Sequence, residues 1–325
     1  MDIVICINKQ YLMPAGVMLC SLFENNKEEQ INIHILLGEG GDQCLKPLQE
    51  MTERYHQTIQ FYDMKDVQTE DFPVGLYFQE PFITKEAYFR LFVMDVLPQT
   101  LEKVLYLDVD MVICSSIREL WNTDISDVAV GAVPDCFHQD IHETNRIGYE
   151  VGLGIFNSGV LLINLSYWRD HDVMKEFVAY AREAKDHLKY HDQDVLNYVF
   201  RHCKKELPIR FNLQTIHMYY DRFRYLHFRL IEEVEEAFRH PVIIHYTGPE
   251  KPWYSNAYHP LKNYFEKYRQ LTPWKNDALK WMHIPIKKRL RNLLVCIRRR
   301  DLHFHASYFD PYFRYYQRDY NGSPA

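Results

Sequence analysis

The stretch VLYLDVDMVIC, from Val104 to Cys114, places two carboxylates inside an otherwise apolar run. Moving an unpaired charge out of water is costly, so Asp108 and Asp110 require a partner that offsets their charge. The chain has two further D-x-D pairs, at residues 170–172 and 192–194, but only this pair lies in a strand-like apolar run. The partner of these two aspartates is the first question that the sequence raises.

Strand-like and helix-like segments alternate around this stretch, which predicts a mostly parallel sheet with helices on both faces. In such sheets ligands bind beyond the carboxyl ends of strands, and Asp108 and Asp110 stand at the far end of their run. Alternation along one strand would point both side chains to the same side. The predicted strands are residues 2–8, 31–38, 58–64, 103–114, 128–135, 156–165 and a short one within 241–253, and the predicted helices are residues 15–26, 44–56, 84–97, 166–187 and 192–202.

The composition is that of a globular protein. Of 325 residues, 47% are hydrophobic and 25% are charged, which excludes a wholly disordered chain. The net charge is −6, yet residues 287–300 carry seven basic and no acidic side chains, so the rest of the chain carries −13. This acidic body argues against a general nucleic-acid-binding protein. The change of pattern near residue 270 predicts a main domain over residues 1–270 and a basic, then aromatic, tail over residues 271–325.

The spacing of the cysteines and the pattern of the N-terminal residues indicate in which compartment the protein is expected. The seven cysteines include no C-x-x-C spacing, so neither a zinc cluster nor a disulfide framework is indicated. The opening MDIVICINKQY has no basic segment before its short apolar run and is not typical of a signal peptide. No apolar stretch approaches the roughly 20 residues that span a bilayer. We therefore expect a reducing, cytoplasmic location.

Three interpretations of Asp108 and Asp110 compete. In the simplest, the pair ends a strand, where it caps backbone groups or meets an arginine. In the second, LDVDMV is the D-x-D-x-V signature of a haloacid-dehalogenase-type phosphatase, in which one aspartate is a nucleophile, the other an acid–base, and Mg²⁺ assists. That signature normally lies on the first strand of its domain. Here three predicted strands precede it, and no downstream acidic pair completes the metal site.

The third interpretation is a metal clamp for a nucleotide diphosphate. Two carboxylates hold Mn²⁺ or Mg²⁺, and phosphate oxygens fill the remaining positions. This requires a third ligand at another strand end and a cation near the leaving phosphate. The stretch VIIHYTGPEKPW supplies both, because His245 ends an apolar run and Lys251 follows beyond Gly248. An imidazole beside carboxylates suits Mn²⁺ better than Mg²⁺.

Four blocks of sequence resemble glycosyltransferase family 8, a group of retaining enzymes that includes bacterial lipopolysaccharide galactosyl- and glucosyltransferases and glycogenin. The blocks occur in the family's order, and the resemblance covers roughly residues 2–255. It implies the GT-A fold, a Rossmann-like α/β fold of nucleotide-diphospho-sugar transferases. The blocks are AYFRL (87–91), VLYLDVDMVI (104–113), FNSGVLLINLSYWR (156–169) with HDQDVLN (191–197), and HYTGPEKPW (245–253).

The resemblance implies roles for residues in each block, in the loop after the first strand and at the end of the predicted strand 128–135. They are Asp108, Asp110 and His245 as ligands of Mn²⁺ or Mg²⁺; Gly248 and Lys251 as contacts of the diphosphate; Arg90, Asp135, Asn157 and Asp192 as contacts of the donor sugar's hydroxyls; Val109 and Asn8 as contacts of the nucleoside; and Gln193 beneath the anomeric carbon. Gln193 and Asp192 are the candidate catalytic residues.

The implied reaction moves a hexose, glucose or galactose, from a UDP-sugar to a saccharide, lipid-linked or protein-linked acceptor, as in lipopolysaccharide or other cell-surface glycan synthesis. The diphosphate leaving group needs charge neutralisation rather than a general acid, and the metal and Lys251 supply it. Because Gln193 is a poor nucleophile, we favour departure and attack on the same face of the sugar. Asp192 or Asp194 is the alternative, covalent participant.

One position departs from the family pattern. Where the family commonly has an acidic residue and an asparagine after the first strand, this chain reads INKQY, with Asn8 and Gln10 at those places. Asn8 offers both a donor and an acceptor to a base edge, so uridine preference is the expectation. The departure keeps open a second class of function, a nucleotide-sugar-binding protein with weak or no transfer activity.

Residues 287–300 predict an amphipathic helix. Leu290, Leu293, Leu294 and Ile297 recur at helical spacing among basic residues, which is the pattern of a helix on an anionic membrane. A helix packed on the domain and a dimer contact are equal alternatives. The membrane interpretation places the protein peripherally on the inner face of the cell membrane. Aromatic residues follow from Phe304 to Tyr316, and the loop FPVGLYFQEPF (72–82) is a candidate lid over the donor.

Overall fold

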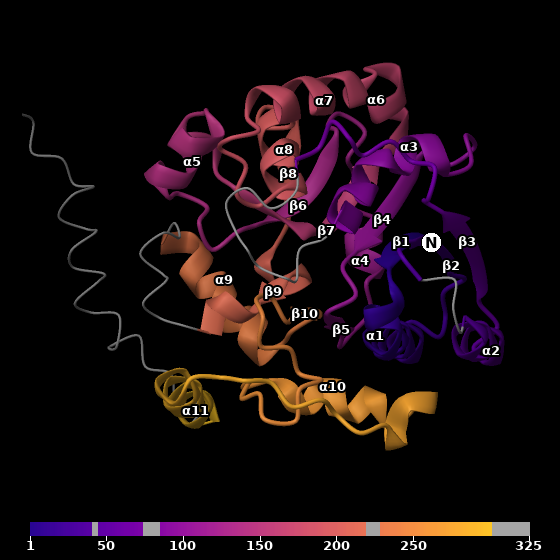
Figure 1. The fold of residues 1–325 in the computed structure, drawn as a ribbon, viewed down its shortest axis with the longest axis vertical. Helices are drawn as coiled ribbons and strands as arrows, with labels where there is room; N and C mark the ends of the chain where they lie inside the picture. The colour runs from indigo at the N-terminus through magenta and orange to yellow at the C-terminus, as the bar shows by residue number, and fades with distance from the viewer. Residues whose placement is uncertain (41–44, 74–84, 219–227, 301–325) are drawn as a thin grey trace, which may run out of the picture.

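The computed structural model describes residues 1–40, 45–73, 85–218 and 228–300 (Figure 1). Its larger sheet is built from β1 (Asp2–Ile7), β2 (Asn32–Leu37), β3 (Thr58–Asp63), β4 (Lys103–Leu107), β6 (Val130–Pro134), β7 (Phe156–Asn164) and β8 (Lys204–Glu206). Among the described residues their order is β3-β2-β1-β4-β7-β6-β8. Strands β1 to β4 run parallel, β8 is parallel to β6, and β7 lies antiparallel between β4 and β6.

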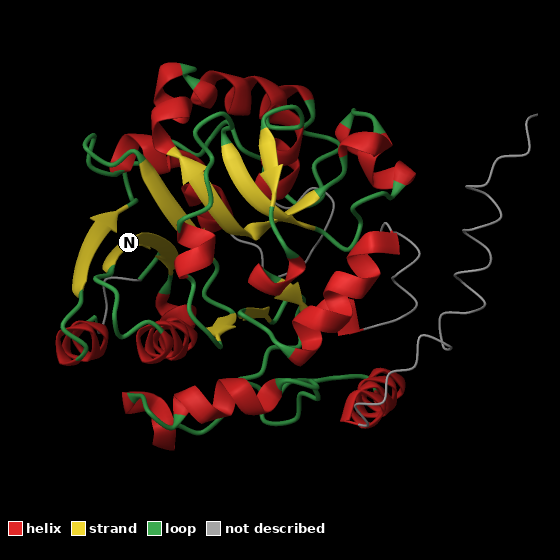
Figure 2. Cartoon of the chain, turned by 180° about the vertical axis from the view of Figure 1, so that it is seen from behind, coloured by secondary structure: helices red, strands yellow, loops and turns green. Residues whose placement is uncertain are grey.

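Helices cover both faces of this sheet, and Figure 2 shows the arrangement from the other side. The helices are α1 (Leu12–Asn25), α2 (Lys46–Arg54), α3 (Val93–Val96), α4 (Arg118–Trp121), α5 (Ile141–Ile147), α6 (Leu165–Asp170), α7 (Val173–Glu183), α8 (Asp192–Val199), α9 (Phe228–Arg239), α10 (Lys262–Arg269) and α11 (Ile286–Arg300). Alternate residues of β1 face opposite helical layers. Ile3 and Ile5 belong to an apolar cluster with Leu19 of α1, whereas Val4 belongs to a cluster with Trp168 of α6. The predicted mostly parallel sheet with helices on both faces is confirmed.

The predicted single strand over residues 103–114 is wrong. It divides into β4 and a short strand β5 (Met111–Ile113), which belongs to a second sheet of order β5-β10-β9 with β9 (Leu213–Gln214) and β10 (Ile243–His245). The division has a physical cause: the Asp108 amide still bonds the Gly159 carbonyl of β7 at 2.9 Å, whereas β5 bonds β10. Asp108 and Asp110 therefore lie in the link between two sheets rather than on one face of one strand.

Two predicted helices also differ from the observed ones. In place of a helix over residues 84–97, residues Lys85–Phe92 form a 3₁₀ helix, η2, which leads into α3. Within η2 the Ala87 carbonyl accepts a bond from the Arg90 side chain at 3.2 Å. The predicted helix 166–187 is divided into α6 and α7, because Asp172 adopts a φ of +48°, outside the helical region.

Residues after α10 run back along the domain. Lys280 pairs with Tyr254 in an isolated bridge, and the Asn256 side chain bonds both the amide and the carbonyl of Met282. Helix α11 follows, and within the described ranges no helix is both long and apolar enough to cross a bilayer. The division near residue 270 stays a prediction. The aromatic residues after 300 and the lid segment 74–82 lie outside the described residues.

Candidate active site

The carboxyl ends of β1 and β4 open into a cavity of about 680 Å³. The start of β7, the first turn of α8, the loop after β10 and residues of α11 also line it. Every residue to which the family resemblance gives a role lines this cavity: Asn8, Arg90, Asp108, Val109, Asp110, Asp135, Asn157, Asp192, Gln193, His245, Gly248 and Lys251. The structure thus brings together residues that are up to 243 positions apart, and their individual roles stay predictions.

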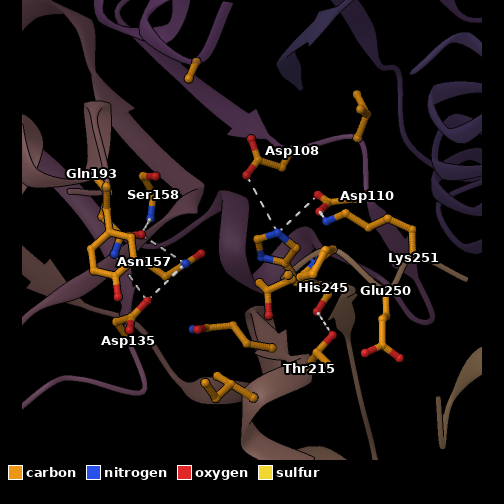
Figure 3. A pocket seen from close by; sticks show the side chains of 18 of the residues that line it. Asp108, Asp110, Asp135, Asn157, Ser158, Gln193, Thr215, His245, Glu250 and Lys251 are labelled. Atoms are coloured by element: carbon orange, nitrogen blue, oxygen red, sulfur yellow. Dashed lines mark hydrogen bonds and ion pairs between the residues drawn. The ribbon is translucent and has the colours of Figure 1, made fainter. Parts of the chain in front are cut away.

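Asp108, Asp110 and His245 form a compact cluster at one side of the cavity (Figure 3). The Nε2 atom of His245 lies 3.2 Å from Oδ1 of Asp110 and 3.7 Å from Oδ2 of Asp108. Gly159 of β7 lies directly behind the cluster. A Cβ atom at that position would be 2.3 Å from the His245 ring, so only glycine leaves room for the imidazole.

The tautomer of His245 follows from its neighbours. The Asn157 Oδ1 atom accepts bonds from the Gly159 amide and from Nδ2 of Asn212. Asn212 therefore presents its Oδ1 atom to Nδ1 of His245, 2.9 Å away, so that Nδ1 carries the proton. The Nε2 lone pair is left facing the two carboxylates, which is the arrangement of a metal-ligating histidine oriented by a neighbouring acceptor.

This set of donors fits a divalent cation. Two carboxylates supply hard oxygen ligands and the neutral imidazole supplies one nitrogen, with all three ligand atoms within 4.8 Å of one another. Such a mixed set is suited to Mn²⁺ and can also bind Mg²⁺. The donor chemistry therefore supports a metal site, and the kind of ion stays a prediction.

Lys251 is the immediate partner of Asp110. Its Nζ atom lies 2.5 Å from Asp110 Oδ2 and donates to the Tyr246 carbonyl at 2.8 Å. Burial by itself would raise the pKa of Asp110, but Lys251 and His245 outweigh it and hold that pKa well below the ordinary value. The carboxylate is therefore ionised, and Lys251 lies where it can reach a nearby phosphate.

Arg90 is the partner of Asp108. Its Nη2 atom donates to Asp108 Oδ1 at 2.9 Å, its Nη1 donates to the Ser158 carbonyl at 2.6 Å, and its Nε lies 3.1 Å from Asp192 Oδ2. The interpretation that expected an arginine beside the pair thus accounts for one oxygen of Asp108. The other oxygen faces His245, which that interpretation does not explain.

Across the cavity, three side chains form a second polar network (Figure 3). Asn157 Nδ2 donates to Asp135 Oδ2 at 3.2 Å and to Gln193 Oε1 at 3.1 Å. The Ser158 amide also donates to Gln193 Oε1, at 3.1 Å. The carbonyl oxygen of Gln193 is therefore held by two donors, and its side chain is fixed in place beside the cavity.

The first turn of α8 contains two aspartates, Asp192 and Asp194, whose surroundings differ. Asp192 lines the cavity, and its Oδ2 atom has no aligned hydrogen-bond donor despite the nearby Arg90. Burial raises the pKa of Asp192 against the opposing effect of Arg90. His191, the residue before it, has a φ of +48°, a backbone strain that is found in proteins at functional sites.

Asp194 does not line the cavity. Its two oxygens accept bonds from Arg146 at 2.6 and 2.9 Å, and Oδ2 also accepts from the backbone amides of Lys189 and Tyr190. Asp194 is fully buried. Its position is that of a structural anchor for the turn before α8, so of the two predicted covalent participants only Asp192 reaches the cavity.

Sequence reasoning missed several residues of the site. Asn212 and Gly159 could not be identified, because their roles depend on contacts with distant parts of the chain. For the aromatic residues of the site, the only indication in the sequence was a high overall content of aromatic residues. The unpredicted residues that line the cavity include Tyr11, Phe137, Tyr190, Tyr258, Lys288, Arg291 and Asn292.

Comparison with known proteins identifies the family. A family model described as glycosyl transferase family 8 matches residues 2–257. The chain belongs to glycosyl transferase family 8. The resemblance in the sequence blocks is thereby confirmed, and the phosphatase interpretation does not apply to a member of this family.

Relatives of this family 8 glycosyltransferase match along most of their length. It is 29% identical to general stress protein A of Bacillus subtilis over 84% of this chain and 94% of that protein. It is also 29% identical to a lipopolysaccharide 1,2-glucosyltransferase of Escherichia coli over 88% of this chain and 80% of that protein. The solved structure of the galactosyltransferase LgtC with donor and acceptor sugar analogues has a TM-score of 0.74 and 28% identity, and covers 90% of this chain and all of that one. The predicted GT-A fold is confirmed.

Proposed function

We propose that this glycosyltransferase moves a hexose, glucose or galactose, from a UDP-sugar to a saccharide acceptor, free or carried on a lipid or protein, with retention of anomeric configuration and dependence on Mn²⁺. The observation that carries the proposal is the pairing of two groups across one cavity. A metal-binding set with a lysine lies on one side, and an aspartate–asparagine–glutamine network lies on the other. Similar proteins include lipopolysaccharide glucosyl- and galactosyltransferases.

On the leaving-group side, Asp108, Asp110 and His245 would hold the cation, which when bound neutralises charge on the diphosphate. Lys251 adds a second positive charge on the same side. Gly248 has a φ of +81° and open space where a Cβ would be, so its backbone can approach phosphate oxygens closely. These residues stabilise the departing UDP without a general acid.

On the sugar side, Asp192 lines the cavity and offers a carboxylate acceptor to a hexose hydroxyl. Asp135 and Asn157 hold Gln193 against the same region. With its oxygen held by two N–H donors, Gln193 is unsuited to form a bond to carbon, which supports same-face transfer. The bond from the anomeric carbon to phosphate breaks, the bond to the acceptor oxygen forms, and the acceptor proton passes to the leaving phosphate oxygen.

The base-binding end of the proposed site lies near Asn8 and Tyr11, which line the cavity beside β1. The Asn8 Oδ1 atom caps the turn by accepting from the Gln10 amide at 3.0 Å. Because Oδ1 is used in this bond, the amide nitrogen of Asn8 is the group that would donate to a base, and a uracil carbonyl is a suitable acceptor. Uridine as the nucleoside therefore fits the proposal.

A donor-hydrolysis panel tests this function. We expect the protein to release UDP slowly from UDP-glucose or UDP-galactose in the presence of Mn²⁺, less with Mg²⁺ and not at all with EDTA, whereas GDP-mannose remains intact. Chromatographic measurement of released nucleotide separates these cases. Binding of UDP-hexoses without turnover of any of them, even with saccharide acceptors added, would instead support the nucleotide-sugar-binding alternative.

We also propose that the protein is cytoplasmic and that residues 287–300 make a peripheral membrane contact. Leu290 and Leu294 of α11 are 55% and 52% exposed, one turn apart among basic residues. We expect the full chain to co-sediment with vesicles that contain phosphatidylglycerol, and the variant with Leu290→Ser and Leu294→Ser to lose most of this binding. The control is Ile141→Ser, which changes an equally exposed residue on α5. Equal binding by all three proteins would contradict the membrane contact.

A further inference from the structure

We propose that Glu250 is a positioning residue that ties helix α11 to the loop of residues 247–251, so that α11 supports the donor diphosphate site. The proposal rests on the function proposed above, in which Gly248 and Lys251 contact the diphosphate. Glu250 has no assigned role in the sequence pattern, and α11 lies outside the part of the chain that the family model matches.

The contacts of Glu250 join the two elements. Oε1 of Glu250 lies 2.7 Å from Lys288 Nζ, and Oε2 accepts a hydrogen bond from Asn292 Nδ2. Lys288 and Asn292 are four residues apart, so both lie on the same face of α11. The Glu250 side chain is only 11% exposed and Asn292 is 2% exposed, so this contact is largely shielded from water.

The position of Glu250 allows it to restrain Lys251, the next residue in the chain. Figure 3 shows the Lys251 side chain reaching toward Asp110 while the Glu250 side chain points away from it. Adjacent residues of one loop therefore hold two different partners, the metal-binding set and α11. Gly248, two residues earlier, has a positive φ and lacks a side chain to restrain it. The contacts of Glu250 with α11 thus hold the loop of residues 247–251 from one side, while Lys251 contacts Asp110 on the other side.

Helix α11 has one face that lines the cavity and another that is exposed to solvent. Its residues Lys288, Arg291 and Asn292 line the same cavity as Lys251. Its outer residues include Leu290 and Leu294, which are exposed. A helix that only packed on the domain would direct its apolar side inward. Val295 of α11 packs against the main apolar cluster, but Lys288 and Asn292 line the cavity, so α11 adds polar side chains to the cavity besides packing on the domain.

The test compares variants that remove or exchange the ion pair. Glu250→Gln and Lys288→Met each remove one charge, and the double variant Glu250→Lys with Lys288→Glu exchanges them. Lys287→Met is the matched control, because Lys287 is an exposed lysine of the same helix. Measurements on the full chain are UDP binding in the presence of Mn²⁺ by titration calorimetry, and KM for donor and for acceptor, with thermal unfolding as the check on folding.

We expect each single variant to weaken UDP binding and raise the donor KM by about tenfold, since small misplacements of binding groups have effects of this order. The acceptor KM should remain unchanged, the exchange variant should recover most of the loss, and Lys287→Met should behave as the parent. Lys288 is 39% exposed, so Lys288→Met keeps the test available if Glu250→Gln folds poorly.

The outcomes separate this inference from the proposed function. If the parent protein fails to bind UDP at all, the proposed function fails. If the parent binds UDP and the single variants bind it equally well, only the role of Glu250 fails. A rise in acceptor KM alone would assign Lys288 to the acceptor instead, and absence of recovery in the exchange variant would show that the ion pair is not the cause; either result overturns the proposal.

Discussion

Replacing Asp110 with asparagine is expected to lower metal-dependent donor turnover by at least about 10³-fold while leaving the fold intact. The substitution keeps the shape of the side chain but removes the charge that faces both His245 and Lys251. One ligand for the cation is weakened, and Lys251 loses the carboxylate that holds it in the site.

The measurement is release of UDP from the best donor in the panel, with circular dichroism to verify folding. Asp170→Asn is the control, because Asp170 belongs to another D-x-D pair and is exposed at the end of α6. Turnover by Asp110→Asn within about threefold of the parent would remove Asp110 from the metal-binding set.

The second large effect is on stability and distinguishes Asp194 from Asp192. Asp194→Asn replaces a fully buried carboxylate, whose two oxygens accept from Arg146 and two backbone amides, by an amide with a single acceptor oxygen, so we expect the free energy of unfolding to fall by about 3 kcal/mol. Asp192→Asn should lower stability less, because Arg90 keeps Asp108 as a partner and burial already raises the pKa of Asp192 and disfavours its charge. That variant should instead lose donor turnover.

Urea unfolding and donor hydrolysis, measured on both variants, test the distinction. The two aspartates lie on the same turn of α8 and undergo the same chemical change, so each variant is the control of the other. If Asp194→Asn kept its stability and lost turnover, Asp194 would be a participant in the chemistry rather than an anchor for the turn.

The sequence predicted the larger sheet well because burial patterns are local. Runs such as residues 31–38 carry their own signal of a buried strand, and the structure places a strand there from Asn32 to Leu37. Part of the site could also be predicted, since Asp108 and His245 stand at the ends of such runs and Lys251 follows six residues after His245. The strand-end positions, together with the order of the four sequence blocks, predicted one shared site, and Asp108, His245 and Lys251 line one cavity.

What the sequence could not predict depends on pairing between distant segments. The division of residues 103–114 into two strands arises because the Asp108 amide bonds Gly159 of β7, whereas Met111–Ile113 pair with β10. Asn212 orients His245 only after β9 and β10 have come together. Likewise, an apolar and basic helix at residues 286–300 gives no sign in its spacing that Lys288 and Asn292 will reach Glu250.

The contact between Lys251 and Asp110 has a consequence for the order of binding. Lys251 pairs with Asp110, one of the carboxylates of the proposed metal site, so under the proposed function the lysine ammonium and the cation would compete when no diphosphate is bound. A diphosphate that draws Lys251 away releases Asp110, and each ligand then favours the other. Thermodynamic reciprocity requires that nucleotide tightens metal binding by the same factor as metal tightens nucleotide binding. A single lysine would thus make the free enzyme a poor metal binder and couple cofactor uptake to the arrival of the donor.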